Sequence, residues 1–225
     1  DSPPFQGSKT NIGFDSGTNS ISLAGVGLFD NSTDIDSETS IDDIGGVASS
    51  GTYLFNETLD LGAVFTLNLR KLIQTDSVYS SDLIDSVTDV DARQDFDGTA
   101  SVDTNAEVFV QFSQDGSNYN NFQKFANGEF KGRTFKFKTV LKTNDTNQDI
   151  RVSQLGYFAE FKQRTEVGSK TSSGNTQVTY DHTFFTGTSA LLGANSNLPS
   201  IAITAFDMQS GDFYEITNQT GDGFQ

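Results

Sequence analysis

Between residues 108 and 161, phenylalanine alternates with polar residues, and this pattern constrains the fold more than any other feature of the chain. The stretch reads VFVQFSQDGSNYNNFQKFANGEFKGRTFKFKTVLKTNDTNQDIRVSQLGYFAEF. Side chains that alternate with a period of two point to opposite faces of a β-strand, so one face is buried and the other is wet. Residues 106–113, 119–125, 133–143 and 150–161 are therefore predicted to be strands of an antiparallel sheet.

The stretch 133–143 also predicts which side chains are buried. Phe135 and Phe137 are predicted to point into the core. Because side chains alternate along a strand, Lys136 and Lys138 then both point outward on the opposite face. The run Gln-Asp-Gly-Ser at residues 114–117 predicts a hairpin turn before the strand that contains Tyr119.

The composition supports a large apolar core without cross-links. The 225 residues include twenty Phe but no Trp, one Met and no Cys. Each buried Phe contributes roughly 1.5–3 kcal/mol, so most of these rings are expected to lie in the core. No disulfide can form, and no stretch approaches the run of about eighteen apolar residues that a membrane-spanning helix needs.

We predict an all-β fold made of a jelly-roll-like β-sandwich followed by a smaller antiparallel β module. Residues 1–20, rich in Gly, Ser and Asn, are expected to be an N-terminal extension, and residues 21–161 the sandwich domain. Further strands are expected at 51–55 and 63–73. At residues 80–90, Leu83, Ile84 and Val87 are spaced three or four apart, which leaves a helical turn open as an alternative.

The character of the chain changes after the sandwich domain. Residues 162–175 are polar and read as a linker. Residues 176–225 form the second module, which we expect to be incomplete, with strands at 176–180, 200–206 and 213–217. Because the chain begins with Asp and stops shortly after a Gly-Phe pair, we expect these residues to be an excerpt of a longer polypeptide.

The formal charge of −16 is unevenly distributed. Residues 1–123 hold 20 of the 30 acidic residues, and residues 124–170 hold ten of the 14 basic ones. A strongly acidic chain repels phosphate backbones, so nucleic acid is not expected as a partner.

Two blocks of sequence resemble a known family. In the first block, GEFKGR at 128–133 followed by Phe135 and Phe137 is the most distinctive part, and FSQDG at 112–116 precedes it. The second block is PSIAIT at 199–204 and SGDFYEITN at 210–218, followed by Thr220, Gly223 and Phe224. In this order, the two blocks resemble the C-terminal region of tail-tip host-specificity and tail fibre proteins of long-tailed bacteriophages. The resemblance covers most of the chain from residue 51 onward, and the first fifty residues match no part of that pattern.

The resemblance implies a receptor-binding tail protein that acts without catalysis and without a cofactor. Such a protein assembles in the host cytoplasm and resides in the virion. Its expected partners are further copies of itself, with a trimer favoured, other tail proteins, and a glycan or protein receptor on the host surface. Two other classes remain open: a carbohydrate-binding module of a secreted glycosidase, and a purely architectural virion protein such as a tail adaptor or a capsid decoration.

The residues give little support for catalysis. His182 is the one histidine, and a hydrolase triad needs a base beside a nucleophile with an acid to orient it. If residues 181 and 182 lie in a strand, Asp181 and His182 point to opposite faces, and no G-x-S-x-G pattern is present. Paired carboxylates could cleave a glycan, but nothing singles out one pair among thirty acids.

Acidic clusters raise the question of calcium. One cluster comprises Asp30, Asp34, Asp36, Glu38, Asp42 and Asp43, and the other Asp89, Asp91, Asp95 and Asp97. The second cluster lacks the glycine and the terminal glutamate of an EF-hand loop. We therefore interpret both clusters as solvated loops and predict no metal site.

Sugar binding commonly uses exposed aromatic rings. Without Trp, the candidate rings are Tyr119 in the hairpin loop and Tyr214 near the end of the chain, and Asn118, Asn120 and Asp212 are candidates for hydrogen bonds to a ligand. Tyr214 lies within a predicted strand, where simple packing is the better interpretation, whereas for Tyr119 packing and binding are equally favoured.

Overall fold

The computed structural model describes residues 3–25, 46–79, 104–146, 148–171, 174–188 and 197–225, and every structural statement below concerns these residues. They form an all-β fold, as the sequence predicts. The strands are β1 (Ser8–Thr10), β2 (Ile12–Asp15), β3 (Ser20–Leu23), β4 (Ser50–Leu54), β5 (Leu59–Tyr79), β6 (Thr104–Ser113), β7 (Gln123–Lys124), β8 (Gly128–Thr143), β9 (Gln148–Phe161), β10 (Val178–Thr179) and β11 (Gly223–Phe224). The helical alternative at residues 80–90 lies outside the described residues.

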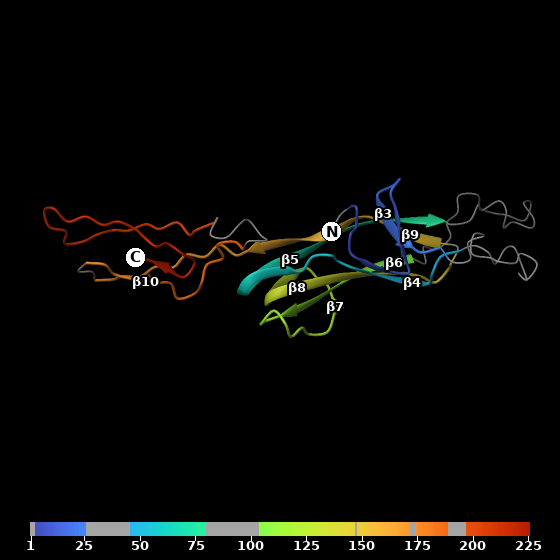
Figure 1. Ribbon diagram of the computed structural model, residues 1–225, viewed down its shortest axis with the longest axis horizontal. Coiled ribbons are helices and arrows are strands. Elements are labelled where there is room, and N and C mark those ends of the chain that lie inside the picture. Colours follow the sequence, from blue (N-terminus) through green and yellow to red (C-terminus); the bar gives the residue numbers. More distant parts are fainter. Residues whose placement is uncertain (1–2, 26–45, 80–103, 147, 172–173, 189–196) are drawn as a thin grey trace, which may run out of the picture.

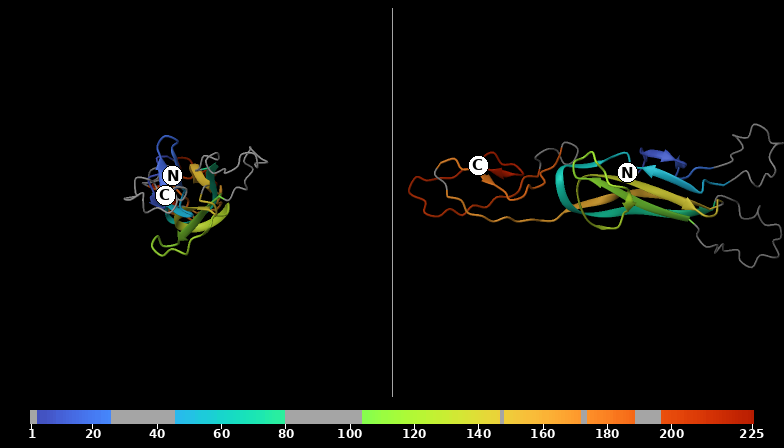
Figure 2. Two further views of the ribbon diagram at one scale, coloured as in Figure 1. Left: turned by 90° about the vertical axis from the view of Figure 1, so that its right-hand side faces the viewer. Right: turned by 90° about the horizontal axis from the view of Figure 1, so that it is seen from below.

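Nine strands form one antiparallel sheet with β8 near its middle. One edge of β8 pairs with β6, and the other edge pairs with β5 over residues 128–135 and with β4 over residues 138–142. β5 is long enough to continue past β8 and pair with β9 from Leu67 to Tyr79, and β9 in turn pairs with β3. The sheet therefore curls from the β6–β8–β4 side to the β5–β9–β3 side, and its long strands run along the long axis of the molecule (Figures 1 and 2).

The space between these two sides of the sheet is the hydrophobic core. In β8, Phe135, Phe137 and Leu141 are at most 1% exposed, whereas Lys136 and Lys138 are half-buried on the opposite face. The predicted orientation of this strand is thus confirmed. Because the period-two pattern places one side chain in two on the inside, a single strand supplies several large residues to the core.

Aromatic rings connect the core across strands that are far apart in sequence. Phe137 of β8 stacks on Tyr157 of β9 with ring centroids 4.3 Å apart, and it also contacts Phe125 and Phe55 at 5.6 Å and 5.7 Å. Pairs of this kind contribute roughly 0.5–1.5 kcal/mol each beyond the area that they bury. Among the described residues, five Phe side chains are buried in this core and four more pack against it, while five others are exposed, so the expectation that most of the rings lie in the core is met only in part.

The N-terminal residues differ from the expected extension. β1 pairs with β4 and β2 pairs with β3, while Phe5 is fully buried against Tyr53 with ring centroids 5.9 Å apart. The Tyr53 hydroxyl accepts a hydrogen bond of 2.8 Å from the Gly7 amide. The Gly- and Ser-rich composition did not indicate these short strands, because the contacts that hold them come from partners distant in sequence, such as Tyr53 for Phe5 and Val152 for Ile21.

The C-terminal region is less regular than expected. Residues 162–171 and 174–175 contain no strand, in keeping with the expected linker, and β10 pairs with β11 in a separate two-stranded sheet. The prediction of strands at 200–206 and 213–217 is wrong, because neither segment pairs in a β-ladder with any described residue. Both segments alternate in sequence, but among the described residues their backbone pairing is limited to Thr217, which exchanges two hydrogen bonds with Gln225, and this is too short for a strand. In Figure 1 the C-terminal region extends away from the sandwich along the long axis of the molecule.

Candidate functional site

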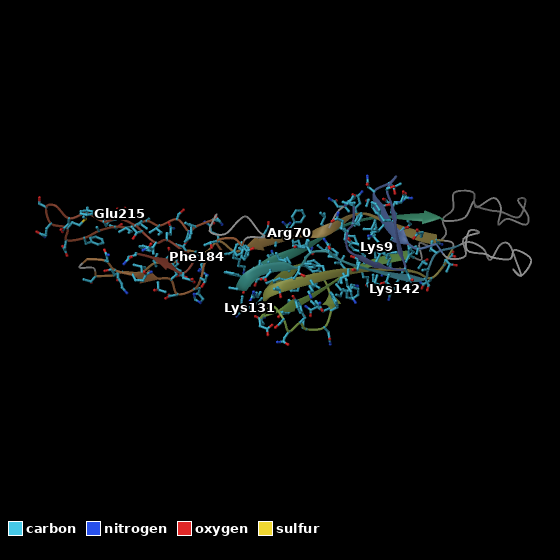
Figure 3. All side chains as sticks on the ribbon, in the orientation of Figure 1. Lys9, Arg70, Lys131, Lys142, Phe184 and Glu215 are labelled. Atoms are coloured by element: carbon cyan, nitrogen blue, oxygen red, sulfur yellow. The ribbon has the colours of Figure 1, made fainter. Side chains whose placement is uncertain are left out.

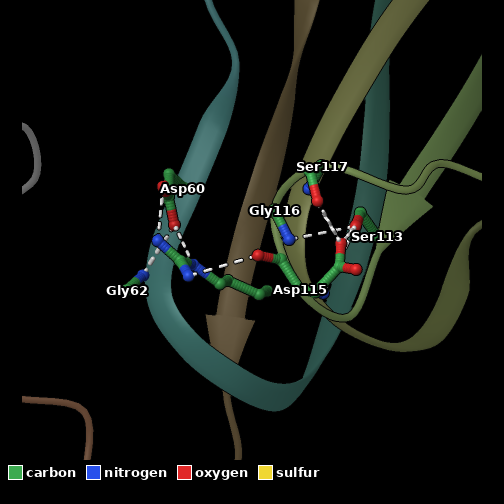
Figure 4. Close-up of polar contacts among 7 residues, drawn as sticks. Asp60, Gly62, Ser113, Asp115, Gly116 and Ser117 are labelled. Atoms are coloured by element: carbon green, nitrogen blue, oxygen red, sulfur yellow. Dashed lines mark hydrogen bonds and ion pairs between the residues drawn. The ribbon is translucent and has the colours of Figure 1, made fainter.

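The candidate site is the loop of residues 113–122, which connects β6 to β7. Its centre is the carboxylate of Asp115. Oδ1 accepts hydrogen bonds from the Ser117 and Asn118 amides, both at 2.8 Å, and from the Ser113 hydroxyl at 2.8 Å. Oδ2 accepts a further bond of 2.6 Å from the Asn118 side-chain amide. One carboxylate therefore bridges several donors of the turn, and Figure 4 shows its bonds to Ser113 and Ser117.

This hydrogen-bonding pattern changes the acidity of Asp115. The donors stabilise the charged carboxylate, above all the backbone and side-chain amides of Asn118 and then the Ser117 amide, and they hold its pKa far below the ordinary value. Asp115 is therefore ionised whenever the protein is folded near neutral pH. The turn also requires Gly116, which has a φ of +88°, a conformation that side chains disfavour.

Arg133 fixes the turn to the sheet. Its Nη1 donates a hydrogen bond of 3.3 Å to the Asp115 carbonyl oxygen, and its Nε donates one of 3.2 Å to Asp60 Oδ1. Burial opposes ionisation of Asp60, but the hydrogen bonds from the Gly62 amide and from Arg133 outweigh this effect and lower its pKa. The guanidinium thus links β5 and β8 to the loop (Figure 4).

The second half of the loop lies across the outer face of β6 and β8. Asn120 donates its amide to the Phe112 carbonyl oxygen at 3.1 Å, and its Oδ1 accepts the Phe112 amide at 2.7 Å. These two bonds place the neighbouring Tyr119 beside β8, where Lys136 Nζ lies 4.2 Å from the centre of its ring. Tyr119 is half-buried, while Asn118 and Asn120 remain exposed.

A second lysine on this face has the same kind of contact. Lys138 Nζ lies 4.5 Å from the ring centre of Phe122 and 5.5 Å from that of Phe109. At the edge, Lys124 pairs with Glu107 at 2.5 Å, and this contact lowers the pKa of the Glu107 carboxyl. The outer face of β6 and β8 is therefore a surface of lysines and aromatic rings, and the alternation of β8 had already placed its two lysines together.

The structure brings together three of the five predicted binding residues. Asn118, Tyr119 and Asn120 form part of one loop, whereas Asp212 and Tyr214 lie in the C-terminal region that extends away from the sandwich (Figure 1). Asp212 Oδ2 accepts the Gln209 amide at 2.6 Å, and Tyr214 is 56% exposed, so packing does not explain its position. The contributions of Lys136, Lys138 and Phe122 were not predicted, because their contacts with the loop depend on how the loop folds back.

The histidine, His182, belongs neither to the loop of residues 113–122 nor to the segment that contains Asp212 and Tyr214. His182 is exposed, and its Nδ1 is 3.7 Å from Glu166 Oε1, while the amides of residues 181 and 182 donate to the same carboxylate. Glu166 is also paired with Arg164 at 3.2 Å. These contacts fix the chain just after β10 to the linker residue Glu166, and no hydroxyl nucleophile among the described residues is bonded to the His182 ring.

Neither acidic cluster considered for calcium lies within the described residues. Among the residues that are described, no group of three or more His, Cys, Asp or Glu side chains is placed to hold a metal ion. The same residues contain no helix long and apolar enough to cross a membrane.

Comparison with known proteins finds no relative of this chain. No protein-family model matches the chain, and searches of curated proteins and of solved structures return no match either.

Proposed function

We propose that this chain is part of a bacteriophage tail and contributes to recognition of the host receptor without catalysing a reaction. Two arguments support the proposal: the resemblance of residues 108–161 and 199–224 to tail-tip and tail fibre proteins, and the loop of residues 113–122. The loop is the observation that carries it, since it presents Tyr119 and two exposed asparagines from a rigid sheet.

The physical basis is preorganisation. A loop that is already held by Asp115 and by the Asn120 contacts loses little conformational freedom when a ligand binds, so more of the contact energy is available for affinity. Each contact with a surface glycan or protein is weak by itself. Several copies on one tail would raise the avidity roughly 10²–10⁴-fold without any new contact.

The partners follow from the proposal. The chain would reside in the virion, contact other tail proteins, and assemble as a homo-oligomer, for which a trimer is favoured by the resemblance. The receptor is a glycan or a protein on the surface of the host.

Binding of labelled protein to intact bacteria tests the proposal. The chain is displayed in several copies on a bead and exposed to a panel of strains, and Tyr119→Ala is compared with the wild type. We expect binding to at least one strain, and a loss of about tenfold or more in the variant, because several weakened contacts multiply. Thr66→Ala, an exposed position on β5, is the matched control and should bind normally.

Two results would contradict the proposal. Normal binding by Tyr119→Ala would show that the loop does not contact the receptor. Binding of the wild type to no strain would favour a purely architectural virion protein. Binding that is abolished by a soluble neutral oligosaccharide, together with a catalytic domain in the same polypeptide, would instead favour the carbohydrate-binding module.

A further inference from the structure

The outer face of β6 and β8 carries positive charge in a chain that is acidic as a whole. Residues 124–142 contain six basic residues and one acidic residue, although the formal charge of the chain is −16. Alternation along β8 places three lysines on this face, and a fourth, in β7, lies beside Phe109 of β6. We call these four side chains the lysine face: Lys124, Lys136, Lys138 and Lys142. Figure 3 labels Lys142, where β8 runs beside β4.

One acidic side chain lies among these lysines. Glu107 of β6 lies opposite Val140 of β8 and pairs with Lys124 at 2.5 Å. The other three lysines of the face form no ion pair with any described residue. Because four lysines face one glutamate, three positive charges are left without an acidic partner in the part of the chain that the structure describes.

Aromatic rings position two of these ammonium groups. Lys136 Nζ lies over the ring of Tyr119 at 4.2 Å, and Lys138 Nζ lies over the ring of Phe122 at 4.5 Å. An ammonium group is attracted to the face of an aromatic ring, so each contact restrains a long, flexible side chain. Both rings belong to the loop of residues 113–122. The loop therefore holds two cations close to the sheet before a ligand arrives, which reduces the conformational freedom lost on binding.

These contacts determine which ligand chemistry the lysine face fits. An ammonium group covers one face of each ring, so a neutral sugar cannot stack on that face while the lysine stays in place. The groups that remain available are the ammonium protons, which bind carboxylate and phosphate oxygens. Lys136 and Lys138 are two residues apart on one strand, about 7 Å from Cα to Cα, so they can contact two separate anionic groups at once.

We propose that the lysine face binds an acidic glycan, that is, a polysaccharide that carries carboxylate or phosphate groups. This inference rests on the proposed recognition of a host receptor and specifies the chemistry of that receptor. A ligand held by ammonium groups contacts the protein mainly through charge, and such contacts are weak one at a time at an exposed surface. A polymer with repeated anionic groups overcomes this weakness because it engages several lysines in one molecule.

A strand of nucleic acid is acidic as well, but it fits this face less well. It carries one negative charge per about 3.4 Å, and a chain with a formal charge of −16 repels such a dense anion more than a glycan whose charges are farther apart. Proteins that bind single strands also stack bases on open aromatic rings, whereas here lysines lie over the rings of Tyr119 and Phe122.

Binding of soluble polymers to the immobilised full chain tests this proposal. The polymers are polygalacturonate, which carries carboxylates, poly(glycerol phosphate), which carries phosphates, and dextran, which is neutral. We expect at least one acidic polymer to bind at about 0.1 M NaCl, and dextran not to bind. The affinity should fall about tenfold or more at about 1 M NaCl, because the screening length shrinks from about 10 Å to about 3 Å.

Charge variants locate the binding on the lysine face. The double variant Lys136→Gln, Lys138→Gln should bind the acidic polymer about tenfold more weakly or worse, because it removes both positioned charges and keeps most of each side chain. The matched control is Lys71→Gln, Lys170→Gln, which changes the net charge equally at two exposed positions outside the lysine face and should bind normally.

A gain of affinity is expected from the opposite change. Glu107→Gln removes the one acidic group of the face and frees Lys124, so it should bind the acidic polymer about two- to fivefold more tightly. This gain does not depend on whether the double lysine variant folds.

The proposal is overturned if neither acidic polymer binds, if dextran binds equally well, or if the two double variants lose affinity equally. Tighter binding of a single-stranded oligonucleotide than of either acidic polymer would also overturn it and would assign the face to nucleic acid. If the chain binds intact bacteria but no acidic polymer, receptor recognition stands and only the assigned chemistry fails. If an acidic polymer binds through the lysine face but no strain is bound, the site stands and receptor recognition fails.

Discussion

Phe185 stacks on Phe161 with ring centroids 4.4 Å apart and ring planes at 15°, which joins the C-terminal region to the last residue of β9. Phe65 meets both rings edge-on, at 5.7 Å from Phe161 and 5.5 Å from Phe185. This three-ring cluster lies at the end of the sandwich from which the C-terminal region departs. The cluster is therefore a packing contact between the sandwich and the start of the C-terminal region.

Replacing Phe185 with alanine should release the C-terminal region from the sandwich. Loss of two aromatic pairs costs about 1–3 kcal/mol, all of it at this junction. Limited proteolysis should then cut the linker at residues 162–175 faster, while the melting temperature of the sandwich changes little. Phe213→Ala removes a ring that is 84% exposed and should leave the cleavage rate unchanged, and equal rates in the two variants would contradict the role of the cluster.

Asp115→Ala should loosen the loop of residues 113–122, because several donors lose their acceptor at once. Hydrogen exchange of the Ser117 and Asn118 amides should become faster, whereas exchange in β8 should not change. The folded state lowers the pKa of this carboxyl, so its stabilising effect is present at neutral pH and is lost as the pH falls below about 4 toward the lowered pKa. The difference between wild type and variant should therefore shrink in acid, and a constant difference would contradict this origin.

Tyr157 should be among the last tyrosines to ionise. Tyr157 is partly buried and its ring stacks on Phe137, and burial, with a smaller effect from Glu57, raises its pKa to about 12. A raised pKa means that the contribution of this group to stability is complete below about pH 10 and is lost as the pH rises toward 12. In an alkaline titration followed by tyrosinate absorbance, Tyr157→Phe should remove the step near pH 12 and keep the stacked ring; an unchanged curve would show that another group produces that step.

Thr139→Val should stabilise the protein. Thr139 is fully buried in β8, and its hydroxyl has no hydrogen-bond partner among the described atoms. Valine has nearly the same shape without the cost of an unpaired polar group, so we expect a gain of about 1 kcal/mol, or about 2–4 °C in melting temperature. Urea denaturation measures the free energy of unfolding directly. Thr66→Val, at an exposed position of β5, is the control and should change it by less.

Sequence patterns predicted some features of the candidate loop but not its contacts with the sheet. The Gln-Asp-Gly-Ser run correctly predicted that the chain turns after β6, and the alternation of β8 correctly placed Lys136 and Lys138 on one face. The strand expected at 119–125 is wrong in its extent, because only β7 (Gln123–Lys124) forms there and Tyr119 makes an isolated bridge to Ser113. No pattern indicated that Tyr119 would lie over Lys136 or that Arg133 would join the turn to Asp60, since these contacts link residues that are brought together only by strand pairing.

At the two ends of the chain, the sequence patterns led to expectations that the structure contradicts. Phe5 and Ile12 lie in stretches whose composition indicated an extension, yet both side chains are buried by partner strands distant in sequence. The segments 200–206 and 213–217 alternate as strands do, yet neither forms a β-ladder with a described residue, although Thr217 at the end of the second segment exchanges two backbone hydrogen bonds with Gln225. Local composition reports what a segment favours, but pairing depends on which other segment lies beside it.

The amino-acid sequence by itself determined the all-β class and the buried face of β8, because side-chain alternation is a local property of an extended chain. Only the tertiary structure decided that β5 bridges β8 and β9, that Asp115 and Tyr119 belong to one ordered loop, and that the rings of Phe206 and Phe213 remain exposed. These features depend on contacts between segments up to about a hundred residues apart, and such contacts are set by the packing of the whole sheet rather than by any one segment.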